Sequence, residues 1–551
     1  MNTKQSKKYE ERRKTNFFAF AVLFAVLALV ATALGSASGA TPPAEEWNKT
    51  FGGTGSDYAR SVQQTTDGGY IVAGYTESYG AGFVAFWLVK TDANGNEQWN
   101  KTFGGTRCDF VESVQQTTDG GYILAGYTNS CGAGKNDAWL VKTDSNGNMQ
   151  WDKTFGGTDY DGTWAVQQTT DGGYILAGFK DAYGASLADA WLIKTDANGN
   201  KQWDRTFGGT NPDVAMAVQQ TTGGGYIFAG YTESYGAGDR DFWLVKTDAN
   251  GNKQWDRTFG GADWDEANSV QQTTSGDYIL AGYTASYGAG KTDALLVKTD
   301  SNGYEIWKKT FGGVSYDKAH SVQQTTDGGY IFAGSTSSYG AGWWDDDVWL
   351  VKTDANGNEE WNKTFGGTRG EGANSVQQTT DGGYIFAGDT TSYGAGNYDF
   401  WLVKVKGKPV KPTVSVATNK PSYKPGETMT VTIGLKNPTA SSVDSYFIWY
   451  LGLPSYGYWS PILSTPLMML PPNFDQTYNF SIPVGNWGLV GFDAVWYVAL
   501  LEPTAPYATI SSDTANWKYN PRTTQEAEAK AEPEEIAKQI GKELEGVEFA
   551  A

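Results

Sequence analysis

The sequence predicts an all-β fold built from a repeated unit, and three observations support this. The segment W-L-V-K-T-D-A-N-G-N-E-Q-W, which begins at Trp87, recurs along the chain with a period of 52 residues and one step of 54. Glycine contributes 70 of the 551 residues, and aromatic residues make up 14%. Asp-Gly and Asn-Gly pairs separate short runs of β-forming residues, as they do in hairpins. The last tryptophan of the segment recurs as Trp47, Trp99, Trp151, Trp203, Trp255, Trp307 and Trp361.

The first forty residues have the pattern of an export signal. Residues 1–16 are basic, residues 17–35 form an apolar run, and small residues up to Ala40 suit a cleavage site. The pattern predicts a signal peptide over residues 1–40. Because the apolar run is also long enough to span a bilayer, a retained membrane anchor is the alternative. In either case we expect the rest of the chain to be extracellular, secreted or held at the cell surface, since the basic residues stay inside.

Each repeat is expected to hold four antiparallel strands. In the first repeat these are Arg60–Thr65, Tyr70–Thr76, Phe86–Thr91 and Glu97–Phe103, and tight turns join the first strand to the second and the third to the fourth. Four strands in about 50 residues is the pattern of a propeller blade.

The number of strands predicts that the repeats form a ring. Seven sets of the first three strands occur, but only six are followed by a fourth. The seventh set stops at Lys404, whereas an unmatched fourth strand, Glu45–Phe51, precedes the first set. We therefore predict a seven-bladed β-propeller over residues 45–404 that the N-terminal strand closes, so that no sheet edge is left open. The fourth-to-first and second-to-third loops, which vary most, then lie together on one face.

A different domain follows the repeats. Residues 405–411 are predicted to be a linker, residues 412–521 an Ig-like β-sandwich, and residues 522–551 an acidic tail with a short helix. The segment S-Y-x-P-G-E that starts at Ser422, followed by an alternating strand, resembles Ig-like modules of surface proteins.

The repeat itself resembles those of propeller proteins on archaeal and bacterial cell surfaces, including quinoprotein-like and kelch-like propellers. The shared pattern is W-L-V-K-T-D-x-N-G-x-x-x-W. Quinoprotein propellers carry D-x-x-x-G-x-x-x-W, usually in eight blades, often with adjacent cysteines against the cofactor. Here Asp92, Gly95 and Trp99 make a motif one residue shorter, and the two cysteines are not adjacent. The resemblance therefore implies the propeller fold, and we expect neither PQQ nor another cofactor.

The charge of the chain limits its partners. The formal net charge is −19, and the basic N-terminal segment makes the remainder more acidic still. Such a surface repels phosphate groups, so nucleic acid is not an expected partner. Membrane contact is expected only through residues 17–35, if the signal is not cleaved.

Features common to all blades are predicted to be structural, because a single ligand site needs asymmetry. An acid occurs in every fourth-to-first loop, and we expect it to accept hydrogen bonds from loop backbone rather than to bind cations. The same holds for the aspartates before the third strands. The turn at Asp92-x-Asn94-Gly95-Asn96 is predicted to be an Asx turn, with calcium as the alternative. The loop acids are Asp57, Asp109, Asp161, Asp213, Asp265, Asp317 and Glu371.

Positions that differ between blades are the better candidates for a site. Three residues after each loop acid, at the expected mouth of the central channel, the side chains differ in size and charge. The sixth blade alone has a longer second-to-third loop, which contains two adjacent tryptophans and two acids. Aromatic side chains beside carboxylates suit sugars. The ligand-binding candidates are Trp343, Trp344, Asp345, Asp346, His320, Tyr316, Trp264 and Trp164.

The only two cysteines, Cys108 and Cys131, lie in neighbouring loops of the second blade. In an exported protein this predicts a disulfide. With the only histidine, His320, four blades away, a catalytic cysteine is not expected.

Together these observations favour a non-enzymatic cell-surface binding or adhesion protein, whose partner is an envelope glycan or a surface protein. An extracellular enzyme acting on polysaccharide is one alternative, because paired loop acids such as Asp159 and Asp161, or Asp263 and Asp265, are what glycoside hydrolysis requires. A structural surface-layer component is the other.

Overall fold

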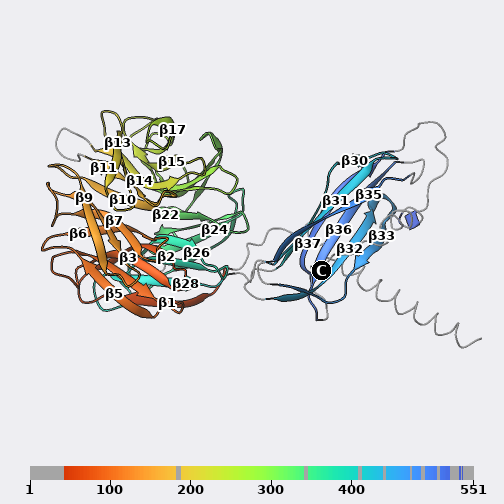
Figure 1. Cartoon of the computed structure of the whole chain (residues 1–551), viewed down its shortest axis with the longest axis horizontal. Helices are drawn as coiled ribbons and strands as arrows, with labels where there is room; N and C mark the ends of the chain where they lie inside the picture. The colour runs from red at the N-terminus through yellow and green to blue at the C-terminus, as the bar shows by residue number, and fades with distance from the viewer. Residues whose placement is uncertain are drawn as a thin grey trace, which may run out of the picture. The chain divides into compact units, whose positions relative to one another are not determined.

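The computed structural model describes residues 42–180, 188–340, 345–407, 412–437, 442–471, 474–485, 491–504, 509–520, 533–534 and 537. Their regular secondary structure is mainly β-strand, with one 3-10 turn at Pro454–Tyr456 and helical residues at 533–534 and 537. The chain divides into two compact units, one of Met1–Gln377 with Phe386–Val403 and the other of Gln378–Ile385 with Lys404–Ala551. Figure 1 shows strands as the main element of both units. The predicted all-β fold is confirmed.

The first part of the chain is a series of four-stranded antiparallel sheets, as in a β-propeller. The first sheet holds β2 (Asp57–Gln64), β3 (Tyr70–Thr76), β4 (Ala85–Thr91) and β5 (Glu97–Phe103), in that order. Five further sheets repeat this order: β6 (Asp109–Gln116), β7 (Tyr122–Thr128), β8 (Asp137–Thr143), β9 (Met149–Phe155); β10 (Gly162–Gln168), β11 (Tyr174–Lys180), β12 (Asp189–Thr195), β13 (Lys201–Phe207); β14 (Asp213–Gln220), β15 (Tyr226–Thr232), β16 (Asp241–Thr247), β17 (Lys253–Phe259); β18 (Asp265–Gln272), β19 (Tyr278–Thr284), β20 (Asp293–Thr299), β21 (Glu305–Phe311); β22 (Asp317–Gln324), β23 (Tyr330–Thr336), β24 (Asp347–Thr353), β25 (Glu359–Phe365).

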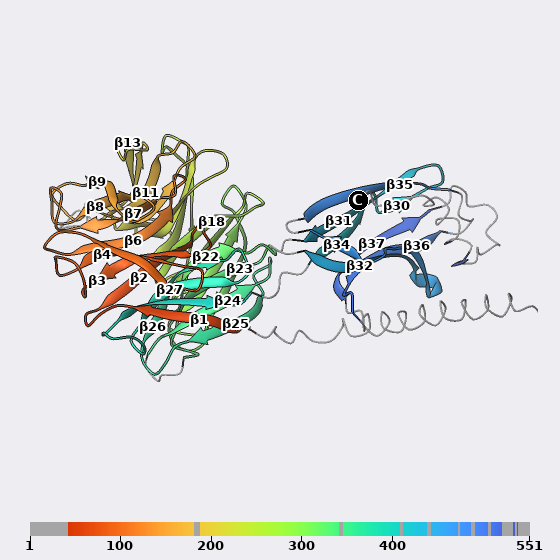
Figure 2. The same cartoon turned by 60° about the horizontal axis from the view of Figure 1, so that its bottom comes forward.

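One more sheet joins the start of the chain to the last repeat. Its order is β1-β28-β27-β26, with β1 at Glu45–Phe51, β26 at Glu371–Gln378, β27 at Tyr384–Thr390 and β28 at Asp399–Val405. Figures 1 and 2 both show the red β1 among the cyan and green strands of the last repeat. The N-terminal strand therefore supplies the fourth strand that the last repeat lacks.

Hydrophobic cores lie between neighbouring sheets, which explains why the second and third strands are apolar on both faces. One such core packs Ile71 and Leu88 of the first sheet against Val111, Leu124 and Trp139 of the second, and all five side chains are buried. A strand covered on both sides needs a continuous apolar run instead of an alternating pattern.

The recurrent tryptophan of the fourth strand packs on the following sheet. Trp99 contacts Tyr122 with ring centroids 5.9 Å apart, and a Cβ on Gly147 would lie 2.5 Å from the Trp99 ring. Trp47 of β1 makes the same contact with Gly95 of the first sheet, at the same distance. The fixed period of tryptophan and Asn-Gly thus reflects one contact repeated between successive sheets.

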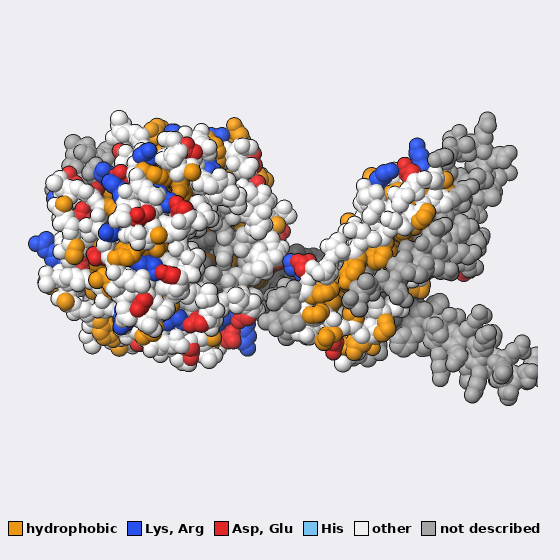
Figure 3. Space-filling view, in the orientation of Figure 1, with side chains coloured by type: hydrophobic (Ala, Val, Ile, Leu, Met, Phe, Trp, Pro, Cys, Tyr) orange, Lys and Arg blue, Asp and Glu red, His pale blue; other side chains and the backbone are white. Residues whose placement is uncertain are grey.

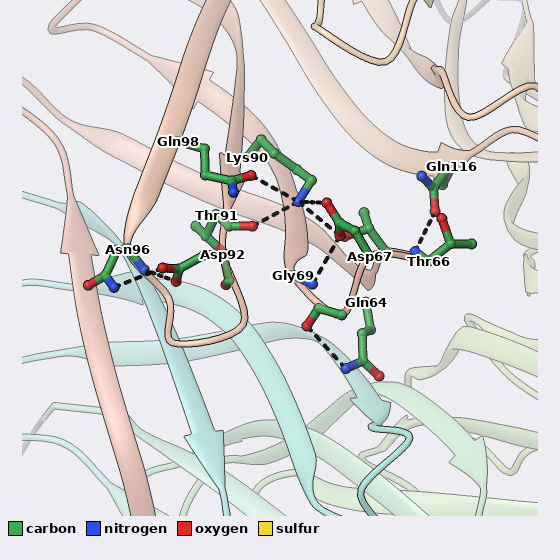
Figure 4. A network of polar contacts seen from close by, with 12 residues as sticks. Gln64, Thr66, Asp67, Gly69, Lys90, Thr91, Asp92, Asn96, Gln98 and Gln116 are labelled. Carbon is green, nitrogen blue, oxygen red and sulfur yellow. Dashed lines mark hydrogen bonds and ion pairs between the residues drawn. The ribbon is translucent and has the colours of Figure 1, made fainter. Parts of the chain in front are cut away.

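The lysine of W-L-V-K-T-D holds two turns together, as Figure 4 shows for the first sheet. The Lys90 Nζ lies 2.9 Å from an Asp67 carboxylate oxygen and donates to the Thr91 carbonyl at 2.8 Å. In the next turn, the Asp92 carboxylate accepts the Asn94 and Asn96 backbone N–H groups at 2.9 and 2.8 Å. These bonds are those of an Asx turn, as predicted.

The fourth repeat departs from this pattern, and this leads to a prediction about stability. Gly223 stands where Asp67 stands in the first sheet, so Lys246 donates to the Thr247 carbonyl at 2.7 Å and has no carboxylate partner among the described residues. Burial lowers the pKa of Lys246. A Cβ on Gly223 would meet nothing within 4 Å. Gly223→Asp is therefore expected to stabilise the protein by about 1 kcal/mol, from a less flexible unfolded chain and a restored ion pair.

The measurement is urea unfolding of the full chain, with Gly223→Ala as the control that changes backbone freedom alone. We expect the aspartate variant to be the more stable of the two, and only its extra stability to fall as salt is added. Equal stability of the two variants would show that the ion pair contributes nothing.

Glutamines join neighbouring sheets around the centre. The Gln63 side-chain oxygen accepts the Gln116 backbone N–H at 2.6 Å, and the corresponding glutamine of each following sheet up to β18 repeats this bond. The Gln377 oxygen accepts the Gln64 N–H, also at 2.6 Å, so the last repeat contacts the first as the others contact each other.

The second unit contains two sheets on one hydrophobic core. A three-stranded sheet has the order β29 (Thr413–Thr418), β31 (Thr428–Asn437), β35 (Phe474–Pro483). The other has the order β30 (Ser422–Tyr423), β37 (Thr509–Tyr519), β36 (Phe492–Leu501), β32 (Val443–Leu453), β33 (Tyr458–Ser464), and β34 (Met468–Leu470) also pairs with β32. Ile433 from the first sheet and Trp449 and Trp496 from the second are wholly buried in the shared core.

Several predictions concern residues that the structure does not describe. The export signal and most of the acidic tail lie outside the described residues, although Ala537 of the tail is buried in the core of the second unit. None of the helices found among the described residues is long and apolar enough to cross a membrane.

Candidate functional site

A bulge in the first strand of the sheets turns one residue toward a cavity that the sheets share. In the first sheet Ala59 pairs with Gly74 and Ser61 pairs with Ala73, so Arg60 is left without a partner. The same irregularity occurs in β6, β10, β14, β18 and β22. The strands come close together there, since a Cβ on Gly74 would lie 1.9 Å from the Tyr58 carbonyl oxygen. The bulge and its facing glycine therefore aim one variable side chain per blade at the channel.

These side chains line a cavity of about 240 Å³ at the end of the channel nearest the variable loops. The seven positions were predicted from the sequence to form the channel mouth, and the structure brings them together. Because they differ in charge, size and polarity, the cavity has no rotational symmetry and can hold one ligand in one orientation. Its lining consists of Arg60, Glu112, Trp164, Met216, Asn268, His320 and Asn374.

A second cavity of about 280 Å³ lies further along the channel and differs in kind. Each repeat contributes the same valine and glutamine to it, such as Val62 and Gln63. Since those glutamines hold the sheets together, this region is part of the framework, and the variable end is the candidate site.

Arg60 and Glu112 form an ion pair at one side of the site. The Arg60 Nε lies 3.5 Å from a Glu112 carboxylate oxygen, and its Nη2 donates to the Tyr75 hydroxyl at 2.9 Å. Burial raises the pKa of Glu112 to about 7, and Arg60 opposes that shift. Glu112 therefore gains or loses its negative charge near neutral pH.

A further acid lies behind the lining. Burial raises the pKa of Asp389 to about 6, and Arg60 and the Asn374 amide act in the opposite direction. The Asn374 Nδ2 donates to an Asp389 oxygen at 3.3 Å. Sequence reasoning missed Asp389. The sequence did contain a sign of it. Asp389 of the last repeat stands at the position of Tyr75 in the first repeat and Tyr127 in the second, and no other repeat has an acid there.

In three consecutive repeats, the fifth to the seventh, the lining residue makes the same polar contact with the next repeat. The Asn268 and Asn374 amides donate to the carbonyl oxygens of Ala319 and Ala59 at 3.0 and 2.8 Å. The His320 Nδ1 lies 2.9 Å from the Ala373 carbonyl. Burial lowers the pKa of His320 to about 4, so the ring is neutral at ordinary pH and Nδ1 carries its proton.

The structure separates the predicted ligand-binding residues into two groups. Trp164 and His320 line the cavity. Trp264 and Tyr316 do not: they are 51% and 45% exposed, with the Arg240 guanidinium 4.8 Å and the Lys291 ammonium 4.6 Å from their ring centroids.

The long loop of the sixth repeat is only partly described. Trp343 and Trp344 lie outside the described residues. Asp345 is exposed, and Asp346 is half-buried and accepts a hydrogen bond from the Ser337 hydroxyl.

The acids shared by the repeats hold loop backbone, as predicted. The Asp57 carboxylate is fully buried and accepts the Gly53 N–H at 2.9 Å and the Ser78 hydroxyl at 2.7 Å. Asp137, from the set before the third strands, accepts the Ala133 and Gly134 N–H groups at 2.9 and 3.0 Å. Within the described part of the chain, no three His, Cys, Asp or Glu side chains are placed to share a metal ion.

The predicted disulfide between Cys108 and Cys131 is not formed, and both cysteines are free in the structure. Cys108 lies in a bridge with Val84 and its carbonyl accepts the Asn129 N–H. Cys131 takes the place that Tyr79 has in the first repeat, where the side chain lies on Trp87 and reaches the Gly52 carbonyl. That carbonyl belongs to the loop that corresponds to the one holding Cys108, so the two loops are neighbours as predicted although the two cysteines are not bonded. Neighbouring loops alone therefore did not determine the pairing.

Comparisons with known proteins add little about activity. No protein-family model matches the chain. The chain is 25% identical over 257 residues to the regulatory protein FlaEY of Caulobacter vibrioides, a match that spans 42% of this chain and 24% of that protein. Among solved structures, it is similar to the WD40 domain of Neurospora crassa Pan2, with 12% identity and a TM-score of 0.41 over 65% of this chain and 90% of that one. It is also similar to a bifunctional GH43-CE protein of Bacteroides eggerthii, with 11% identity and a TM-score of 0.25 over 89% of this chain and 62% of that one.

Proposed function

We propose that this chain is an extracellular cell-surface binding protein whose propeller binds a glycan at the mouth of its channel. In this proposal the repeats form a closed seven-bladed ring, and an Ig-like sandwich follows it. The observation that supports binding is the cavity of about 240 Å³, which the seven variable residues line. A cavity with an aromatic side chain, an ion pair and several amide and imidazole groups has the composition of a site for a small polar ligand such as a sugar residue.

The same geometry argues for binding over hydrolysis. Glycoside hydrolysis requires two carboxyl groups that face the substrate from opposite sides of one bond. Glu112 lines the cavity, but Asp389 is not part of its lining. Asp161 and Asp265 are each one member of the acid pairs considered for the enzyme alternative, and both are fully buried. Asp265 accepts the Gly261 N–H at 2.8 Å and the Ser286 hydroxyl at 2.7 Å, so it serves the loop.

Exposed aromatic side chains around the mouth extend the proposed site. Trp264 and Tyr316, both about half exposed, lie in the variable loops and present ring faces on which further sugar residues could stack. On the face seen in Figure 3, acidic and basic side chains are interspersed over the repeats.

Retention of the full chain on immobilised envelope polysaccharides tests the proposal. Met216→Trp places a large ring in the cavity, whereas Met149→Trp, at an exposed site 52% accessible on the fourth strand of the second sheet, is the matched control. We expect the parent and the control to be retained and the cavity variant to be lost. Absence of retention on every polysaccharide would refute glycan binding, and equal retention of both variants would refute the channel mouth as the site. Release of soluble sugar would instead identify a hydrolase.

A further inference from the structure

The acceptor atoms of the channel mouth indicate which chemical group enters it. Asn268, His320 and Asn374 each use an N–H group to bind a backbone carbonyl of the next repeat. That bond fixes the orientation of the side chain and leaves the Asn268 Oδ1, the His320 Nε2 and the Asn374 Oδ1 for the cavity. All three of these atoms are hydrogen-bond acceptors, and the Asn268 Nδ2 keeps a second N–H beside them. Three adjacent repeats therefore present acceptors, and a ligand must supply donors to them.

The charge of the site favours the same kind of ligand. The carboxylates near the mouth are Glu112 and Asp389, and the basic group paired with them is Arg60. One further charge of each sign, on Lys318 and Asp346, acts on His320. When both acids are ionised, the groups named here therefore carry one more negative charge than positive. Arg60 is already engaged by Glu112 and the Tyr75 hydroxyl. An anion would therefore find Arg60 occupied and further acid close by, whereas a cation would be attracted.

The size of the cavity limits the group further. About 240 Å³ suits a small polar group or one sugar residue, and Trp164 and Met216 supply apolar wall on which a carbon skeleton can pack. A bulky quaternary ammonium has no N–H to give to the three acceptors. A primary ammonium has three donors and a single positive charge.

We propose that the group which enters the channel mouth is a protonated primary amine, such as that of a 2-amino sugar. It donates to Asn268, His320 and Asn374 while the Glu112 carboxylate balances its charge. This inference rests on the proposed glycan-binding function and specifies the sugar class. It also distinguishes an amino sugar from an N-acetylated one, because acetylation removes the charge and two of the three donors.

Saturation-transfer NMR on the full chain provides the test, with ethanolamine as the amine probe and ethylene glycol as its neutral analogue. Each compound is also tested for its ability to displace the chain from the immobilised polysaccharide. We expect ethanolamine to bind at pH 8 and ethylene glycol not to bind. Glu112→Gln keeps the shape and removes the charge, so ethanolamine should bind about fivefold more weakly. Glu77→Gln, at an exposed glutamate in a variable loop of the first repeat, should leave binding unchanged.

The pH dependence of the unmodified chain provides a second measurement that needs no variant. Around Glu112, the titratable groups are Arg60 on β2, Tyr75 on β3 and Tyr127 on β7, and both tyrosines have raised pKa values because they are buried. Asp389 ionises near pH 6, and His320 stays neutral above pH 5. The pKa values of about 7 for Glu112 and about 6 for Asp389 therefore place the ionisation of both acids between pH 5.5 and pH 8. Ethanolamine binding should strengthen as the pH rises through this range.

The outcomes separate this inference from the function on which it rests. If ethylene glycol binds as well as ethanolamine, or ethanolamine binding does not depend on Glu112 and pH, the amine assignment is wrong although glycan retention stands. If the polysaccharide retains the chain, but ethanolamine neither binds to the chain nor releases it from the polysaccharide, the assignment is also wrong. If no polysaccharide is retained, the glycan-binding function itself fails.

Discussion

Replacing Gly230 by alanine is expected to destabilise the propeller by about 3 kcal/mol. Gly230 of β15 faces the bulge of β14. There Ala215 pairs with Gly230 and Ala217 pairs with Ala229, so Met216 between them has no partner and points into the channel. A Cβ on Gly230 would lie 1.9 Å from the Val214 carbonyl oxygen. Because the obstructing atom belongs to the backbone, no side-chain rotation can relieve the clash, and the two strands must separate.

Urea unfolding of the full chain, followed by near-ultraviolet circular dichroism, measures this effect. Gly223→Ala is the matched control in the same repeat, because a Cβ there meets no atom within 4 Å. The control should be as stable as the parent or slightly more so. If Gly230→Ala were equally stable, the close approach of β14 and β15 would be incorrect, and so would the direction given to Met216.

Replacing Asp317 by alanine is expected to cost about 3 kcal/mol as well, for a different reason. The Asp317 carboxylate has no exposed surface and accepts the Gly313 N–H at 2.8 Å and the Ser338 hydroxyl at 2.6 Å. The Thr336 hydroxyl donates to its other oxygen. Alanine leaves these three donors without this acceptor, and water cannot easily replace a carboxylate in a buried place.

Two further variants show whether the hydrogen bonds cause the loss. Asp317→Asn keeps one acceptor oxygen, so it should recover part of the stability. Asp345→Ala, at an exposed aspartate of the same repeat, should be close to neutral. The free energy of unfolding of all three comes from the same urea measurement, and equal losses for Asp317→Ala and Asp345→Ala would mean that the loop acid has no structural role.

Much of the strand pattern was predictable from the sequence, because each strand is bounded by glycine-containing turns. The predicted Tyr70–Thr76 and Glu97–Phe103 match β3 and β5, and Glu45–Phe51 matches β1. In the second unit, the sequence analysis did not identify β37 (Thr509–Tyr519). That strand is mostly polar, and only the side chains near its end, such as Trp517, are buried.

The candidate site was predictable in its positions but not in its chemistry. Comparison of the repeats within the chain located the residues equivalent to Arg60, since only variable positions can give an asymmetric site. The sequence could not show that a bulge turns them inward, because Gly74 has the same letter whether or not a carbonyl lies against it. Asp389 belongs to another strand, and its proximity to Arg60 depends on how strands pack.

The pairing of β1 with β28 has a consequence for how the protein is made. β1 is among the first strands to be synthesised, and its partner is the last strand of the repeat region. A nascent or prematurely terminated chain therefore carries two open strand edges, one at each end of the unfinished molecule. Such edges invite pairing with other chains and recognition by chaperones and proteases. The edges are removed once β28 has been made and pairs with β1, so a chain that stops before Asp399 keeps them, whereas one that extends beyond Val405 holds both partners.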